Sequence, residues 1–212
     1  MLIGVEKRFV FIANTKTAST SIEQTLMDHA EIVRTGSPMR KHIALHRALE
    51  VYDFLFSQSE YIPQSFLKFG VMRDPIDWIS SWFRYRKGNS VQSPLPADMT
   101  FPEFWEKRDW NLIRPDGGKF LQRHMFCDPH GHLITDLVIP YQHLARDFQT
   151  LCGSLGIQSP LVRKIVSKIT QDQVIPDDLL EEVQAFYERD YALFDQLHNV
   201  NQPGWARLGH SI

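Results

Sequence analysis

The chain has 212 residues and a formal net charge of −2, with 43% hydrophobic and 23% charged residues. This length suits one α/β domain with a sizeable core and is short for two, so we expect a single domain over residues 1–212. The near-neutral charge gives no overall attraction for nucleic acid or for an acidic membrane surface, and we expect neither partner. A site for an anionic ligand therefore has to come from locally placed basic groups.

The cysteine content and the hydropathy of the sequence indicate the cellular compartment in which the protein works. The chain has two cysteines, Cys127 and Cys152, and no CxxC motif, which is typical of free thiols in a reducing environment. The first residues lack the basic-then-apolar order of a signal peptide, and no apolar run approaches the roughly 20 residues that span a bilayer. We expect a cytoplasmic protein without a membrane span; a lumenal piece of an anchored enzyme is the alternative.

Strands and helices alternate along the first part of the chain. An apolar run at residues 9–13 predicts a strand buried on both faces, and it leads through a polar loop at 14–20 into a helix at 21–29. Helical periodicity returns at 42–56, and a second apolar run at 66–72 is typical of another buried strand. Strand, polar loop and helix in this order are the opening of a P-loop-like domain.

A second strand-to-helix junction follows at Arg73. Asp74 suits the N-cap and Pro75 the first position of a helix that runs through Tyr85. The remaining signals are a helix that begins at the capping box of Thr100 and Glu103, a turn at 116–118, a strand at 133–139, a helix at 146–155 closed by Gly156, and a helical stretch at 176–197. This alternation predicts a three-layer, P-loop-like α/β domain in which helices flank a central, mainly parallel sheet.

The loop after the first strand is suited to binding an anion. Backbone N–H groups at a helix N-terminus point at one spot, where the helix dipole also favours negative charge. The candidate ligands are Lys16 for charge, Ala18 for close approach to the backbone, and the hydroxyl donors Thr17, Ser19, Thr20 and Ser21. A capped helix after a polar turn is the alternative. Since the glycine spacing of a Walker A loop is absent, we do not expect ATP to be held here in its usual way.

The second junction carries a comparable set of groups. Arg73 ends its strand at the edge where open α/β sheets bind ligands, and Ser81 lies about two helical turns past Pro75, on a face that can turn back towards it. An arginine fork and a serine hydroxyl together suit a second phosphate group. The alternative is a capped helix whose arginine pairs with a carboxylate. The basic cluster at 84–87 is either an attraction for an anionic acceptor or a solvated helix end.

Together the two motifs resemble the paired signatures with which the sulfotransferase superfamily binds PAPS (3′-phosphoadenosine-5′-phosphosulfate). The order is the same, with a lysine and hydroxyl-rich loop after a strand, then Arg73-Asp-Pro75 and Ser81. The likeness is greatest to the bacterial and heparan-type glycan branch. It continues through residues 41–42, Gln122, and residues 136–144, 153–157 and 187–194, and so covers nearly the whole chain.

The resemblance implies a PAPS-dependent sulfotransferase that moves a sulfuryl group to an acceptor hydroxyl, on a glycan or glycoconjugate, and releases PAP. It also implies that residues 16–21 bind the 5′-phosphosulfate, with Lys16 near the bridging oxygen. Arg73 and Ser81 would then bind the 3′-phosphate that distinguishes PAPS from ATP.

Two positions depart from the pattern of these relatives. Asn14 stands where many have proline before the lysine loop, and Trp78 stands where many have a second arginine. We expect altered loop stiffness at the first position and one missing cationic contact at the second.

Sulfuryl transfer, like phosphoryl transfer, needs a base near the acceptor hydroxyl and positive charge near the leaving group. Lys16 and the loop amides supply the charge. The resemblance favours His42 as the base, because glycan sulfotransferases with a histidine base carry it in a similar segment between the two motifs. His46 and Glu23 are the alternatives, since some glycan relatives place a glutamate base just after the phosphate loop. Lys41 would assist near the sulfuryl oxygens.

No metal is expected at this site. The two histidines between Cys127 and Leu133 suggest metal ligands, but a hairpin turn accounts for them better. The competing functions are a P-loop small-molecule kinase, which would need Mg²⁺ and a glycine-rich loop, and a non-catalytic PAPS- or nucleotide-binding protein. The sequence leaves the acceptor and the oligomeric state open.

Overall fold

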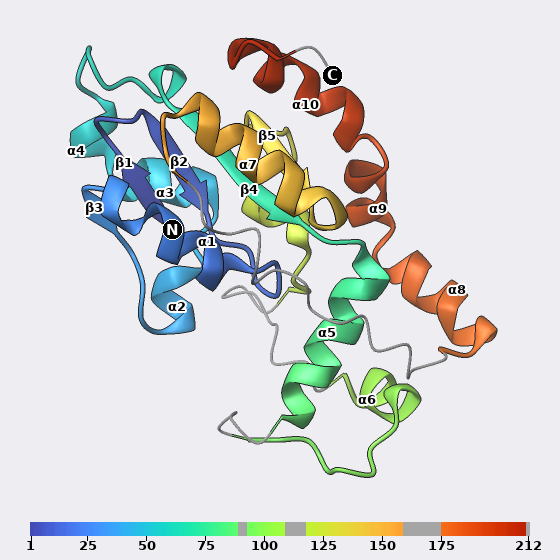
Figure 1. Cartoon of the computed structure of the whole chain (residues 1–212). Helices are drawn as coiled ribbons and strands as arrows, with labels where there is room; N and C mark the ends of the chain where they lie inside the picture. Colours follow the sequence, from blue (N-terminus) through green and yellow to red (C-terminus); the bar gives the residue numbers. More distant parts are fainter. Residues whose placement is uncertain (89–92, 109–117, 159–174, 211–212) are drawn as a thin grey trace.

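The computed structural model describes residues 1–88, 93–108, 118–158 and 175–210. The turn expected at 116–118 lies almost wholly outside these residues. Within them, a five-stranded sheet has the strand order β3-β1-β2-β4-β5 (Figure 1).

The sheet is mixed and mostly parallel. Its strands are β1 (Leu2–Gly4), β2 (Phe9–Ile12), β3 (Ile32–Val33), β4 (Leu67–Met72) and β5 (Leu137–Pro140). β4 runs parallel to β2 and β5, whereas β1 is antiparallel to both of its neighbours. The expected parallel centre is confirmed. The sequence did not predict β1 and β3, because strands of three and two residues are too short to show a hydrophobic pattern.

Helices lie on both faces of the sheet and beyond one of its ends. Their bounds are α1 (Ser19–Leu26), α2 (Pro38–Lys41), α3 (Leu45–Val51), α4 (Asp53–Phe56), α5 (Pro75–Lys87), α6 (Phe101–Lys107), α7 (Leu144–Ser154), α8 (Asp177–Phe186), α9 (Glu188–Phe194) and α10 (Leu197–Arg207). The strand expected at 133–139 joins the sheet only from Leu137, because Leu133 forms a bridge with Cys127 across the turn that holds the two histidines.

The helical stretches expected at 42–56 and 176–197 are both interrupted. α2 ends at Lys41, because the next residue, His42, has a ψ of 80°, outside the helical region, while its ring bonds to the Ala13 carbonyl oxygen. Tyr187 separates α8 from α9 and is buried with its ring 6.0 Å from that of Trp78. In both places a tertiary contact overrides the local helical pattern.

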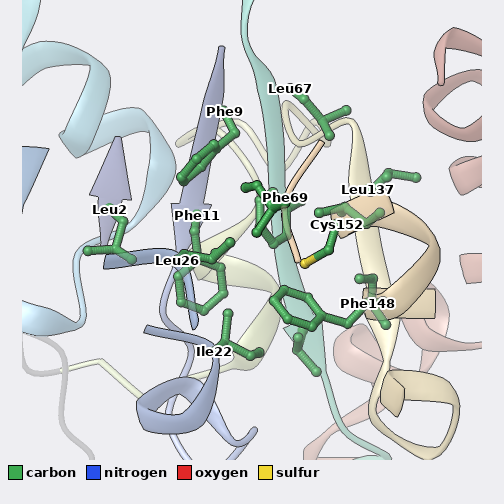
Figure 2. Close-up of a cluster of buried hydrophobic side chains, with 14 of the residues drawn as sticks. Leu2, Phe9, Phe11, Ile22, Leu26, Leu67, Phe69, Leu137, Phe148 and Cys152 are labelled. Atoms are coloured by element: carbon green, nitrogen blue, oxygen red, sulfur yellow. The ribbon is translucent and has the colours of Figure 1, made fainter. Parts of the chain in front are cut away.

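Alternate residues of each strand face opposite layers. Phe9 and Phe11 of β2 pack in one apolar cluster with α1 and α7, whereas Val10 and Ile12 pack in another with α3. Figure 2 shows the first cluster, where labelled side chains of the strands, α1 and α7 meet. The sheet is buried on both faces, and the expected three-layer α/β architecture is confirmed.

A third apolar cluster lies beyond the sheet, between α5, α6 and α8 (Figure 1). Trp78 and Phe83 of α5 pack in it with Trp105 of α6 and with Tyr187. This cluster fixes the direction of α5, the helix that carries Ser81, and so it positions one side of the candidate site.

The helix α10 covers the free edge of β5. Asn201 accepts a hydrogen bond from the Val138 amide (2.8 Å) and donates one to the Val138 carbonyl oxygen (2.9 Å), so a side chain satisfies the strand edge. Gly204 lies against the same strand, and a Cβ atom there would sit 2.2 Å from the Asp136 carbonyl oxygen. A residue without a side chain is therefore needed where α10 approaches the sheet.

We predict that Gly204→Ala lowers the free energy of unfolding by about 1–3 kcal/mol, because the new methyl group meets backbone that cannot move aside. Gly153→Ala in α7 is the matched control, since a Cβ there meets nothing within 4 Å. It should stabilise the protein by up to about 1 kcal/mol through helix propensity. Urea denaturation measures both changes. Equal effects at the two glycines would show that α10 does not need its close approach to β5.

Candidate active site

Two strand-to-helix junctions meet at one edge of the sheet. β2 and β4 are neighbouring parallel strands, so the loop after β2 and the residues after β4 leave the sheet at the same edge. The first loop leads into α1 and the second into α5. Asp74 accepts hydrogen bonds from the amides of Ile76 and Asp77, both at 3.0 Å, which confirms it as the N-cap of α5. The site lies where open α/β sheets bind ligands.

The loop after β2 has the backbone of an anion-binding loop. Lys16 and Ala18 have φ angles of 56° and 58°, a left-handed conformation that is uncommon for residues other than glycine and that clusters at functional sites. α1 begins at Ser19, two residues before the expected start, and its N-cap Ala18 makes no side-chain capping bond. Within the described part of the chain, the amides of residues 16–20 donate to no acceptor. The capped-helix alternative therefore does not describe this helix end, whose N–H groups are open to a ligand.

The hydroxyl groups of the loop have different partners. The Thr17 hydroxyl donates to the Asn14 carbonyl oxygen (3.0 Å), and the exposed Thr20 hydroxyl accepts from Lys41 Nζ (2.9 Å). Ser19 is buried and Ser21 is half-buried. The buried Thr15 hydroxyl, which the sequence analysis did not select, has no partner among the described residues. A buried hydroxyl without a partner beside open amides is the donor that an anionic ligand would satisfy.

Three cations gather around this loop. Burial, and to a smaller degree the positive charges of Arg73 and Arg84, lower the pKa of Lys16 to about 8. Burial, and to a smaller degree Arg84, also lowers the pKa of Arg73. Among the described residues, neither Lys16 nor Arg73 forms an ion pair, and the buried Arg73 Nε has no hydrogen-bond partner. Clustered like charges that repel one another, with a free donor on the buried Arg73, are the environment that a bound anion stabilises.

One face of α5 turns towards the loop. Ser81 is half-buried and shares this face with Arg84 and Tyr85, which follow it at spacings of three and four residues. Lys16 Nζ lies 3.9 Å from the centre of the Tyr85 ring, so the structure brings the loop and the Ser81 face together. No hydrogen bond joins Ser81 to Arg73 within the described residues, and the Arg73 guanidinium lies 4.5 Å from the centre of the Tyr141 ring.

The basic cluster at 84–87 does not act as one patch. Arg84 is exposed and close enough to Lys16 and Arg73 to affect their pKa values. Arg86 is buried, and Lys87 donates to the Met99 carbonyl oxygen (3.0 Å). Of the cluster, Arg84 belongs to the candidate site, whereas Arg86 and Lys87 stabilise the helix and the segment that follows it.

His42 lies beside the loop after β2. Its Nδ1 is 2.6 Å from the carbonyl oxygen of Ala13, which can only accept, so Nδ1 carries the proton in the neutral ring and Nε2 holds the free lone pair. Burial lowers the pKa of His42. Lys41 shifts that pKa in the same direction, while the Ala13 bond and Glu23 oppose the shift. The ring is therefore neutral at physiological pH and has the tautomer that a general base needs.

Both alternative bases are engaged elsewhere. Glu23 is buried, with one oxygen 2.8 Å from Lys41 Nζ and the other 3.5 Å from the amino nitrogen of Met1. Nδ1 of His46 lies 3.3 Å from the carbonyl oxygen of Cys127. Of the three candidates, His42 combines a fixed tautomer with a position next to the loop.

The two positions that depart from the family pattern both support the loop. The Asn14 amide donates to the carbonyl oxygen of Val71 (3.1 Å) and to Gln122 Oε1 (3.0 Å), and the Trp78 indole donates to the carbonyl oxygen of Thr15 (2.9 Å). Tyr141, next to Arg73, was also missed by the sequence analysis. Its place directly after β5 was the available signal, because that strand ends at the ligand-binding edge.

Among the described residues, no helix is long and apolar enough to cross a membrane. The same part of the chain holds no group of three or more histidine, cysteine, aspartate or glutamate side chains arranged for a metal ion.

Comparison with known proteins agrees with the geometry. The sequence profile described as "Sulfotransferase family" matches residues 2–195, which include the whole sheet and both junctions. No curated protein and no solved structure gives a significant match. The site has open loop amides, a Lys16 charge without a counter-ion among the described residues, and the free Nε of the buried Arg73. These groups fit a ligand with two separate phosphate groups, such as PAPS. The chain belongs to the sulfotransferase family and is a PAPS-dependent sulfotransferase.

Proposed function

We propose that this enzyme transfers the sulfuryl group of PAPS to a hydroxyl group of a carbohydrate, as in the bacterial and heparan-type glycan branch of its family. The observation that carries the proposal is the gathering of Lys16, Arg73 and Arg84 around a loop with open amides. We infer a carbohydrate acceptor from His42, because its segment between the two motifs is similar to the one that carries the histidine base in glycan sulfotransferases.

The donor would be held by both junctions. Residues 16–21 would hold the 5′-phosphosulfate through backbone amides, hydroxyls and Lys16, and Arg73 and Ser81 would hold the 3′-phosphate. Arg84 adds positive charge between the two. PAPS supplies the sulfuryl group, with PAP as the leaving group.

Side chains of the protein would transfer the proton and stabilise the leaving group. His42 takes the proton of the acceptor hydroxyl at Nε2, because Nδ1 is held by the Ala13 carbonyl group. Lys16 places positive charge where negative charge develops on the leaving oxygen. Glu23 forms an ion pair with Lys41, and Lys41 donates a hydrogen bond to Thr20. We therefore assign Glu23 and Lys41 the role of holding the segment that contains His42 against α1.

The 3′-phosphate assignment predicts a selective loss in Arg73→Ala. PAP should bind about ten- to a hundredfold more weakly, the effect of one charge-assisted hydrogen bond, while 5′-AMP, which has no 3′-phosphate, should bind nearly as before. Isothermal titration calorimetry measures both ligands. Arg47→Ala, at an exposed arginine that pairs with Glu50, is the control and should change neither. Equal weakening of PAP and 5′-AMP in Arg73→Ala would make Arg73 a structural residue.

The lowered pKa of Lys16 predicts that PAP binding takes up a proton in mildly alkaline solution. Lys16 loses its charge above a pKa of about 8 in the free protein, and a bound anion raises that pKa again. Above about pH 7 the phosphates of PAP are largely doubly ionised, so PAP affinity should be level up to about pH 8 and fall above it. Proton uptake is measured calorimetrically in buffers of different ionisation enthalpy. Lys16→Arg keeps its charge throughout this range and should lose the uptake. Uptake that persists in Lys16→Arg would assign the proton to another group.

The function is tested by transfer of labelled sulfur from PAPS to a panel of glycans, phenols and lipids, without added metal. We expect transfer to a glycan, a roughly 10²- to 10⁴-fold loss of turnover in His42→Ala, and unchanged PAP affinity. Because the pKa of His42 is lowered, the acid limb of the rate should lie below its ordinary value of 6.5.

Three other results would contradict this reading. If Glu23→Gln lowered turnover as much as His42→Ala and left PAP affinity intact, Glu23 would be assigned as the base. PAP binding without transfer to any acceptor would indicate a non-catalytic binder. Use of ATP with Mg²⁺ would indicate a kinase.

A further inference from the structure

One buried side chain joins the ends of β2 and β4. Gln122 is fully buried, and its Oε1 accepts hydrogen bonds from the Arg73 amide (3.1 Å) and from Asn14 Nδ2 (3.0 Å). Its Nε2 donates to the Arg73 carbonyl oxygen (2.8 Å). Arg73 belongs to the proposed 3′-phosphate side and Asn14 begins the proposed phosphate loop, so Gln122 contacts both halves of the site without being exposed to a ligand.

The link begins where the strand pairing ends. β2 and β4 are paired up to Ile12 and Gly70; β2 then enters the loop before α1, whereas β4 continues beside β5 to Met72 and leads into α5. Past that point Asn14 Nδ2 donates to the Val71 carbonyl oxygen, and Asn14 Oδ1 accepts from the Thr15 amide. Side-chain amides thus replace the backbone ladder and continue the connection into the loop.

Gln122 is itself held from the opposite side. Asp190 of α9, fully buried, accepts hydrogen bonds from the amides of Gln122 and Arg123, each at 2.9 Å. Burial raises the pKa of this carboxyl group to about 6, and both amide bonds oppose that shift. A buried carboxyl group fixed by two amides holds the short helix at Gln122 in place, and with it the Gln122 side chain.

We propose that Gln122 is a positioning residue that sets the spacing between the phosphate loop and Arg73, so that one rigid nucleotide reaches both at once. The inference rests on the proposed function, because it takes PAP as the ligand of both sides. Two anion sites on one rigid ligand act as a bivalent pair, and the gain from the second contact is lost when their spacing is wrong. Each single phosphate, by contrast, binds its own side whatever the spacing.

The test compares PAP with its two halves. In Gln122→Met, which keeps the length of the side chain and removes its hydrogen bonds, PAP should bind at least about tenfold more weakly. Binding of 5′-AMP and of 3′-AMP should each change by less than about threefold, measured by isothermal titration calorimetry. Gln122→Leu removes the same hydrogen bonds without adding a charge, gives a second variant if Gln122→Met does not fold, and should change the three affinities in the same directions.

Asn201→Leu is the matched control for lost stability. Asn201 clamps the amide and carbonyl groups of Val138 as Gln122 clamps those of Arg73, but on the edge of β5 that α10 covers. It should lower the melting temperature and leave the preference for PAP over 5′-AMP unchanged. If the wild type and both Gln122 variants showed the same preference for PAP over 5′-AMP, the positioning role of Gln122 would be overturned, but the donor assignment would stand. A wild-type chain that binds PAP no better than 5′-AMP would overturn the donor assignment as well.

Discussion

Parallel pairing of β2 with β4, from Phe9 and Leu67 to Ile12 and Gly70, places the ends of both strands side by side. Because each strand leads directly into a helix, two helix N-termini and their preceding loops share one edge of the sheet. Apolar clusters bury both faces of this sheet, and the third cluster sets the direction of α5. The loop after β2 and Arg73 take their positions from this pair of strands, and His42 bonds to the carbonyl oxygen of Ala13, directly after β2.

The free protein carries unfavourable features at this edge. Lys16 and Ala18 have a left-handed backbone. The pKa values of Lys16 and Arg73 are lowered by burial and by neighbouring positive charge. The buried Thr15 hydroxyl has no hydrogen-bond partner in the described part of the chain. Lys16 rests on the Tyr85 ring, which partly offsets its lack of an anion. Such features persist only where the surrounding packing holds them, and a doubly phosphorylated ligand relieves several of them together.

Local patterns predicted much of this edge. The apolar runs of β2 and β4, the Asp74 cap with Pro75, and the residues from Lys16 to Ser21 are contiguous signals, and the structure places them as expected, apart from an earlier start of α1. The supporting network was not predictable, because Gln122 lies 108 positions from Asn14 and 68 from Asp190, and no periodic pattern connects them. The assignments of His42, Ser81 and the other site residues remain predictions until ligand and variant measurements are made.

The match to the family ends at residue 195, whereas α10 begins at Leu197. This helix carries Asn201, which occupies the amide and carbonyl groups at the outer edge of β5. An expression boundary drawn from the family match would leave these backbone groups bare and uncover apolar side chains of both sheet layers, including Leu137 and Val138. Strand edges of that kind pair with other chains, so a protein cut there would tend to self-associate and precipitate, although its whole candidate site would still be encoded.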